Sequence, residues 1–175
     1  MSMTFNLSTG KVAERKTFIT VAEWSEGTTS SIREILGTRT EDSSMEFNPD
    51  IETMTDVRGI TYTDVNKTEP QQTFDPFYIM GGSNLAAFLT EAALKNDISA
   101  YNNAFTIYQI AAFSGNSTDG YYAVKHEHCT ILPNSIGGDA KVSMPIEIHF
   151  SNEITVGTVN KLSDDFAFTA ASSNL

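Results

Sequence analysis

The sequence has little cysteine, few basic residues and no long apolar run. With Cys129 as the single cysteine, no disulfide can form within the chain, which fits assembly in a reducing cytoplasm. No apolar stretch approaches the roughly 20 residues that span a bilayer, and none follows a basic start in the manner of a secretory signal. We therefore expect a soluble protein without a membrane partner.

The shortage of basic residues limits the kinds of partner. Eleven Lys and Arg stand against 22 Asp and Glu, and the formal net charge is −11. Binding to nucleic-acid phosphates needs clustered Lys and Arg, but here the basic residues are scattered. A direct grip on DNA is thus disfavoured. A surface past which DNA must slide without sticking, by contrast, can be acidic.

Length and composition predict one globular domain over residues 1–175. The chain is long enough to bury a core, and its 40% apolar and 19% charged residues are ordinary for a folded protein. Two polar ends stand out. We predict a flexible N-terminal arm over 1–15 and a loose C-terminal tail over 160–175.

Residues 38–77 form the most distinctive segment, because carboxylates alternate there with apolar β-formers. A solvated acidic tail would lack those apolar residues. Turn signals occur at Asn48-Pro49-Asp50 and at Arg58-Gly59. The pattern predicts a long hairpin or meander that presents an acidic surface.

One amphipathic helix is predicted after Gly81-Gly82. An apolar stripe follows the helical spacing at Leu85, Phe88, Leu89, Ala92 and Ala93. Ser83 is placed to cap the first turn, and we expect the helix to end near Asn96.

The remaining periodic segments read as strands, at residues 16–24, 105–113, 121–132, 140–150 and 153–159. Residues 31–36 are compatible with a helical turn or with a strand. In the 140–150 segment, alternate residues from Val142 to Phe150 should share one face, and Pro145 predicts a sheet edge or an irregularity. The expected fold is mainly β with one helix, a β-sandwich or barrel of about seven or eight strands.

No segment of the sequence is a strong candidate for a metal, catalytic or phosphate-binding site. His126 and His128 should share a face of an extended strand while Cys129 points to the other, and the spacing matches no standard zinc pattern. Carboxylates are so numerous that a catalytic pair would arise by chance. No serine has the nucleophile-elbow pattern, and Gly81-Gly82-Ser83 lacks the phosphate-loop lysine. We expect no metal, no cofactor and no enzymatic activity.

The sequence resembles the major tail tube proteins of long-tailed phages and prophages of Gram-positive bacteria. The resemblance runs through residues 37–82, with the motifs D-I-E-T, T-D-V-N-K-T-E-P and F-D-P-F. It resumes, in collinear order, at 125–131, 134–139 and 144–150. Together these segments cover 66 of the 175 residues.

That resemblance implies a β-sandwich that closes into hexameric rings, which stack into a tail tube of the phage virion after assembly in the bacterial host cytoplasm. Genome DNA would pass along an acidic lumen without specific binding. The implied partners are other copies of the chain, the tape-measure protein, the tail terminator and the distal tail or baseplate proteins. Within this picture we predict four lumen-facing acidic residues, Glu46, Glu52, Asp56 and Asp64.

Two alternatives stay open at this stage. The tube of a contractile bacteriocin or secretion-like apparatus would share the fold, and a neighbouring sheath gene would distinguish it. A carbohydrate-binding or receptor-binding β-sandwich module would instead use the chain's aromatic residues as a stacking platform.

Overall fold

A computed structural model describes residues 2–27 and 30–171 of the chain. In these residues the fold is mainly antiparallel β-sheet with one α-helix, α1 (Asn84–Lys95), as the sequence predicted. The 3-10 helices are η1 (Arg15–Thr17) and η2 (Ile98–Ala100). The strands, in chain order, are β1 (Phe18–Trp24), β2 (Ile32–Ile35), β3 (Met45–Glu46), β4 (Pro49–Thr55), β5 (Thr61–Thr68), β6 (Gln71–Phe74), β7 (Phe105–Asn116), β8 (Gly120–Pro133), β9 (Ile146–His149), β10 (Ile154–Val159) and β11 (Phe168–Ala170).

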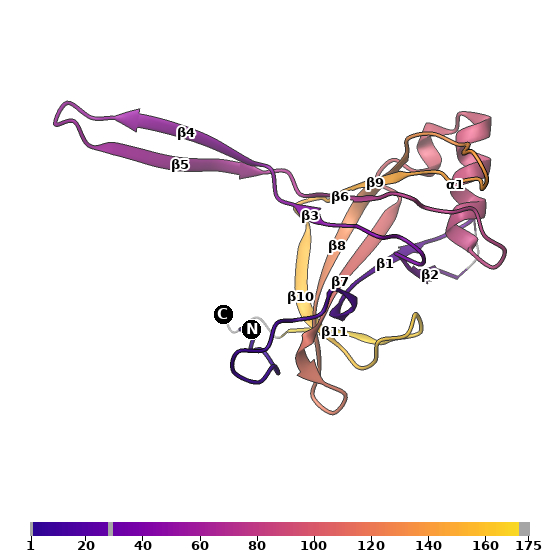
Figure 1. Cartoon of the computed structure of the whole chain (residues 1–175), viewed down its shortest axis with the longest axis horizontal. Coiled ribbons are helices and arrows are strands. Elements are labelled where there is room, and N and C mark those ends of the chain that lie inside the picture. Colours follow the sequence, from indigo (N-terminus) through magenta and orange to yellow (C-terminus); the bar gives the residue numbers. More distant parts are fainter. Residues whose placement is uncertain (1, 28–29, 172–175) are drawn as a thin grey trace.

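The large sheet is built around β8 (Figure 1). Its strand order is β2-β1-β7-β8-β9-β6-β3, and every pairing is antiparallel. The first half of β8 pairs with β10, whereas its last four residues pair with β9. β10 also pairs with β11. One long strand therefore belongs to two diverging layers, which is how a single sheet begins to close on itself.

A buried polar network shows that the sheet curls until distant strands meet. Thr20 on β1 donates a hydrogen bond to Gln72 Oε1 on β6 over 3.1 Å. Gln109 on β7 donates to the same oxygen over 2.8 Å. Gln72 is fully buried, and its amide nitrogen donates to the carbonyl of Ser43. Since β6 is three places from β7 in the strand order, these contacts require a half-closed barrel.

A bulge in β8 corrects the predicted faces of its histidines and cysteine. Phe105 pairs with Cys129 and Ile107 with His126, so three residue steps on β8 oppose two on β7. His128 has a φ of 56° at this point. The prediction that His126 and His128 share a face is wrong. His126 and Cys129 are both buried, whereas His128 is exposed.

Helix α1 is held at both ends as its sequence predicts. Ser83 accepts a hydrogen bond from the Ala86 N–H, and Asn96 ends the helix in the left-handed conformation. Glu34 of β2 adds a contact that was not foreseen. Its carboxylate accepts from the Ser83 hydroxyl over 2.5 Å and from the Leu85 N–H over 3.0 Å. A negative charge at this helix end is favourable because the free N–H groups point toward it.

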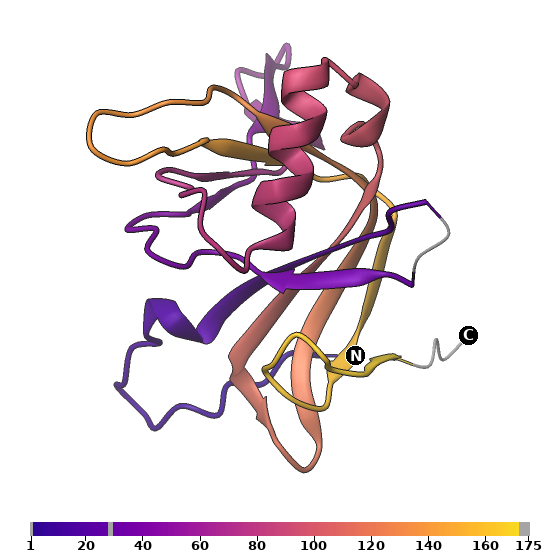
Figure 2. The ribbon, with the colours of Figure 1, turned by 90° about the vertical axis from the view of Figure 1, so that its right-hand side faces the viewer.

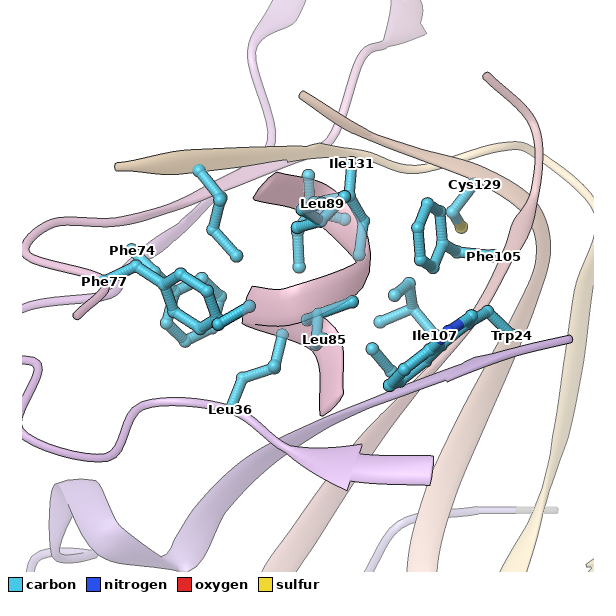
Figure 3. Close-up of a cluster of buried hydrophobic side chains, with 14 of the residues drawn as sticks. Trp24, Leu36, Phe74, Phe77, Leu85, Leu89, Phe105, Ile107, Cys129 and Ile131 are labelled. Carbon is cyan, nitrogen blue, oxygen red and sulfur yellow. The ribbon is translucent and has the colours of Figure 1, made fainter. Parts of the chain in front are cut away.

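The main core lies between α1 and the strands (Figures 2 and 3). Leu85 and Leu89 are fully buried from the helix side, and they pack with apolar side chains of the sheet and of the segments that follow β2 and β6. Those labelled in Figure 3 are Trp24, Leu36, Phe74, Phe77, Phe105, Ile107, Cys129 and Ile131. The predicted apolar stripe is confirmed at Leu85, Leu89 and Ala92.

A second core lies on the other face of β1 and β7. It contains Tyr108 and Ile110, and Phe166, which is 2% exposed, packs onto it from the C-terminal segment. Arg33 of β2 donates a hydrogen bond to the Phe166 carbonyl over 2.6 Å. The segment expected to form the loose C-terminal tail thus contributes Phe166 and β11, while residues 172–175 lie outside the described residues.

The predicted N-terminal arm also touches the body. The backbone of Phe5 bridges Ser114 at the end of β7, and the Phe5 ring packs edge-on against Phe113 at 5.7 Å. The Asn6 N–H donates to the Phe113 carbonyl over 3.0 Å. Most of residues 2–15 remain exposed.

The structure resolves one ambiguous segment and shortens one predicted strand. Residues 31–36, which were ambiguous, contain β2, because pairing with β1 fixes the extended form. The predicted strand over 140–150 is regular only from Ile146 to His149. Pro145 lies just before it, so the irregularity is confirmed. Val142 is 52% exposed, and its predicted place on the inward face is therefore wrong, whereas Met144, Ile146 and Ile148 are buried.

Candidate assembly surface

The strands β4 and β5 form a hairpin that projects from the body (Figure 1). They pair with each other as a separate two-stranded sheet, and in the described structure they pair with no strand of the large sheet. Every residue of both strands is exposed. The hairpin or meander predicted for this region is confirmed as a hairpin, with its turn at Arg58-Gly59.

Asp56 organises the tip of this hairpin. Its carboxylate accepts hydrogen bonds from the backbone N–H groups of Ile60 and Arg58, over 3.0 and 2.8 Å, and from the Tyr62 hydroxyl over 3.3 Å. The bond from Ile60 is the main reason that the pKa of Asp56 lies below its ordinary value. Gly59 supplies the positive φ of 79° that the turn needs. The tip is therefore a defined structure.

The hairpin exposes apolar side chains on both of its faces. Ile51 lies opposite Val65 on one face, and Met54 lies opposite Tyr62 on the other. Seven apolar side chains of the hairpin and its root are between 43% and 106% exposed: Phe47, Ile51, Met54, Val57, Ile60, Tyr62 and Val65. Apolar surface gathered in this way marks an interaction site.

Glu52 and Asp64 lie directly opposite each other on the Met54 face of the hairpin. Like charges at directly opposed positions destabilise a strand pair. Within residues 2–27 and 30–171, no ion pair joins either carboxylate to a basic side chain. The fold gains nothing from this pair, so its charge is available to a partner.

The other two predicted lumen residues lie elsewhere. Asp56 is engaged in the turn, and Glu46 is on β3 at the root of the hairpin. Glu46 lines a small cleft together with Asp42 and Asp75. Asp42 and Asp75 belong to the acidic 38–77 segment but are not among the four predicted lumen residues. They flank β3 and β6, whose pairing brings them together. The structure thus joins Glu52 with Asp64 only, and a lumen-facing role for the four residues stays a prediction.

The large sheet also ends in strands that are paired along one edge only. In the described structure β2 and β3 occupy the two ends of the strand order, and each has a single neighbour. An open strand edge offers backbone N–H and C=O groups to another chain unless something covers it. These edges add a second kind of surface through which copies of the chain can pair.

His126 and Cys129 are buried core residues, and their segment offers no metal or catalytic site among the described residues. No group of three or more His, Cys, Asp or Glu side chains suited to a metal ion is found among the described residues. Burial raises the pKa of the Cys129 thiol to about 11, so the reactive thiolate is scarce at neutral pH. Burial also lowers the pKa of His126, whose ring packs against Phe150 at 4.8 Å.

None of the helices in residues 2–27 and 30–171 has the length and apolar character needed to span a bilayer.

Comparison with known proteins gives matches in structure alone. No protein-family model matches the sequence. No curated protein matches it either. Among solved structures, a chain from the six-fold symmetrised cryo-EM structure of the anti-feeding prophage baseplate is 13% identical, with a TM-score of 0.47, and the match covers 89% of this chain and 100% of that one. A chain from the cryo-EM structure of the tube-terminating cap of the same prophage is 12% identical, with a TM-score of 0.45, covering 87% of this chain and 95% of that one.

Proposed function

We propose that this chain is a structural, non-enzymatic subunit that assembles with copies of itself into stacked hexameric rings, the tail tube of a phage or prophage particle. The observation that carries the proposal is the exposed β4–β5 hairpin, which has apolar side chains on both faces and, within residues 2–27 and 30–171, pairs with no strand of the large sheet. The family resemblance of residues 37–82 names the kind of assembly.

Physical chemistry supports a partner for the hairpin. An isolated two-stranded hairpin is at best marginally stable in water. Burying even half of one of its large apolar side chains against another subunit would contribute on the order of 1 kcal/mol. Seven such side chains are available. Association would thus stabilise both the hairpin and the polymer.

Ring closure would use the sheet edges. An edge strand such as β2 or β3 becomes paired when an identical subunit supplies the next strand. The net charge of −11 suits a tube through which DNA moves, because an acidic wall repels the phosphates instead of retaining them. In this proposal Glu46, Glu52, Asp56 and Asp64 contribute to the acidic bore.

The proposed place is the virion tail. There the tube would meet the tape-measure protein inside, the tail terminator at one end and the distal tail or baseplate proteins at the other. Each of these contacts belongs to the proposal and follows from the family resemblance.

Negative-stain electron microscopy of the concentrated protein tests the proposal. We expect rings or tubes from the full chain and none from a variant in which residues 49–68 are replaced by a short Gly-Ser linker. Circular dichroism and size exclusion would show that this variant still folds, since the hairpin lies outside the large sheet. A full chain that stays monomeric even with the tape-measure and baseplate proteins, or a tube whose bore is lined with lysine and arginine, would contradict the proposal.

A further inference from the structure

All three histidines of the chain lie where the long strand β8 changes partners. His126 is the last residue of β8 that pairs with β10, and His149 on β9 pairs with the first residue of β8 that joins β9. His128 lies between these two points, in the bulge. Histidine is the side chain whose charge changes near neutral pH, so the charge of this junction depends on pH.

The gap between the two ladders is crossed by residues 150–153, which link β9 to β10. The Glu127 N–H donates a hydrogen bond to the Glu153 carbonyl over 3.1 Å, and the Ser151 hydroxyl donates to the Glu127 carbonyl. We call residues 126–129 and 150–153 together the seam. Because single contacts replace a ladder here, the seam is a place where the two layers that share β8 can separate locally.

His126 is the buried histidine of the seam. It is 5% exposed, and its ring packs against the ring of Phe150 with centroids 4.8 Å apart. Its Nδ1 atom is buried and has no hydrogen-bond partner among the described residues. Burial lowers the pKa of His126, since a charge on the ring would lose its hydration. A proton on this ring therefore places a poorly solvated charge against Phe150.

The charged groups around the seam are paired without His126. The pairs are Lys125 with Glu127 over 2.7 Å, His128 with Glu153 over 3.5 Å, and His149 with Glu147 over 2.9 Å. The strand β10 has no ionisable side chain, and that of β7, Tyr108, packs in the second core. The Cys129 thiol, kept neutral by burial, donates to the His126 carbonyl over 3.6 Å. In the described structure, no carboxylate thus forms an ion pair with the His126 ring.

Phe150 connects the seam to the root of the β4–β5 hairpin. Its N–H donates to the carbonyl of Pro70, which lies between β5 and β6, over 3.1 Å. A cleft of about 600 Å³ lies beside this contact, with Lys67 on one side and Ile154 on the other. Figure 1 shows the hairpin leaving the body at this root. The position of Phe150 therefore bears on the direction in which the hairpin points, and the cleft leaves room for a change.

We propose that the seam is a pH-operated hinge. A proton on the His126 ring loosens its packing against Phe150 and lets the β9–β6 layer, with the hairpin that it carries, move against β8 and β10. The neutral ring is the form that the closed seam accommodates, so the seam is closed at neutral pH. As the pH falls below about 6.5, the opened seam binds the proton more readily and becomes more populated.

The exposed pair of His128 with Glu153 acts in the opposite direction, because it joins the two sides of the seam and gains attraction when His128 is protonated. Both side chains are more than half exposed, so this gain is small. Burial of His126 therefore sets the direction of the response. The inference concerns the single folded chain and does not depend on whether the chain forms tubes.

NMR titration of the three histidines tests the first step. We expect the ring signals of His126 to titrate at a lower pH than those of His128 and His149, which are both exposed. The unmodified chain suffices for this measurement. A His126 ring that titrates together with the other two, or above them, would overturn the proposal.

Amide hydrogen exchange tests the opening. After correction for the intrinsic rates, the Glu127 and Phe150 amides should lose protection by up to about tenfold per pH unit below pH ~6.5, while amides of α1 stay better protected. Protection should stay constant in His126→Leu and in His126→Gln, two replacements that guard against misfolding of either one. His128→Gln, in the same bulge, is the matched control and should behave like the unmodified chain. Seam amides that exchange only together with those of α1 would show global unfolding in place of a hinge.

Single-molecule FRET tests the movement, at concentrations too low for polymerisation. Dyes on Val57→Cys at the hairpin tip and on Leu94→Cys of α1 report the position of the hairpin, since both sites are exposed and Cys129 is buried. We expect one narrow population at pH 7.5 and a broader or second population at pH 5.5. The same labels in His126→Leu should give the narrow population at both pH values. An unchanged population at pH 5.5 in the otherwise unmodified chain would mean that the hairpin does not move, and the hinge would be refuted.

Discussion

The β4–β5 hairpin and the body around α1 follow opposite rules. In the body, apolar side chains such as Leu85 and Leu89 are fully buried, and polar groups such as Gln72 have partners. In the hairpin, both faces carry exposed apolar side chains and two opposed carboxylates without a basic partner in the described structure. The body buries a large apolar core, and among its described buried polar side chains His126 Nδ1 lacks a partner, whereas the hairpin buries none of its apolar side chains. This contrast separates the residues that make the fold from those available for assembly.

The largest effect should come from truncating the core under α1. Leu89→Ala removes a fully buried side chain and should lower the free energy of unfolding by about 3 kcal/mol. For a chain of this size the melting temperature should fall by roughly 6–12 °C. Thermal unfolding followed by circular dichroism measures it.

Its counterpart in the hairpin is Val57→Ser. Because Val57 is fully exposed, this change should leave the free energy of unfolding within about 0.5 kcal/mol of the unmodified chain. It should nevertheless weaken polymerisation seen by light scattering. A stability loss as large as that of Leu89→Ala would mean that the tip packs on its own body, and the contrast between the two regions would be broken.

A smaller effect than that of Leu89→Ala is expected in the body as the pH falls. Burial lowers the pKa of His126 in the folded protein, so the unfolded chain binds this proton more readily. The stability associated with a neutral His126 is present above pH ~6.5 and is lost as the pH falls below it. The slope from one such group is at most about 1.4 kcal/mol per pH unit. Urea unfolding between pH 8 and pH 5 should show the decline.

His126→Leu should flatten that decline, because no buried ring remains to be protonated. His128→Gln is the control, since His128 is exposed on the same bulge. Equal slopes in the unmodified chain and the His126→Leu variant would show that other groups govern the acid response.

The sequence predicts a region well when the residues that determine its structure lie close together in the chain. Helix α1 was predicted to within a residue at its ends, because Ser83 and Asn96 act within one turn of the helix. The hairpin was also predicted, from the alternation of residues and the Arg58-Gly59 turn. The isolation of the hairpin from the large sheet was not, since it depends on where β3 and β6 pair.

Two of the misses depend on partners distant in sequence. The bulge at His128 is set by its pairing with β7, and it reverses the predicted faces of β8. β11 has only three residues, and within the described part of the chain it pairs with β10 alone, so its sequence carries little local signal. Glu34 lies in a short strand, and only its approach to α1 reveals it as the acceptor for the Leu85 N–H.

The third prediction tests that contact between β2 and α1. Glu34→Ala should cost about 1 kcal/mol of unfolding free energy, because it leaves the Leu85 N–H without its acceptor and removes a charge from the helix N-terminus. Glu34→Gln should retain part of the stability through its amide oxygen. Chemical denaturation measures both. Glu91→Gln, on the exposed side of α1, is the control and should change little. If Glu34→Ala and Glu34→Gln are both as stable as this control, the contact between Glu34 and the Leu85 N–H does not stabilise the fold.

The smallest effect should come from the opposed carboxylates of the hairpin. Glu52→Gln removes the repulsion between positions 52 and 64 and should stabilise the β4–β5 pair by about 0.3 kcal/mol. Amide hydrogen exchange of the hairpin measures this directly, because the two strands can open without unfolding the body. Added salt should shrink the difference, since it screens exposed charges. Glu46→Gln, on β3, should leave the hairpin exchange unchanged. Slower exchange in Glu52→Gln together with weaker polymerisation would show that the Glu52 carboxylate serves assembly at the expense of hairpin stability. Faster exchange would mean that Glu52 supports the hairpin fold.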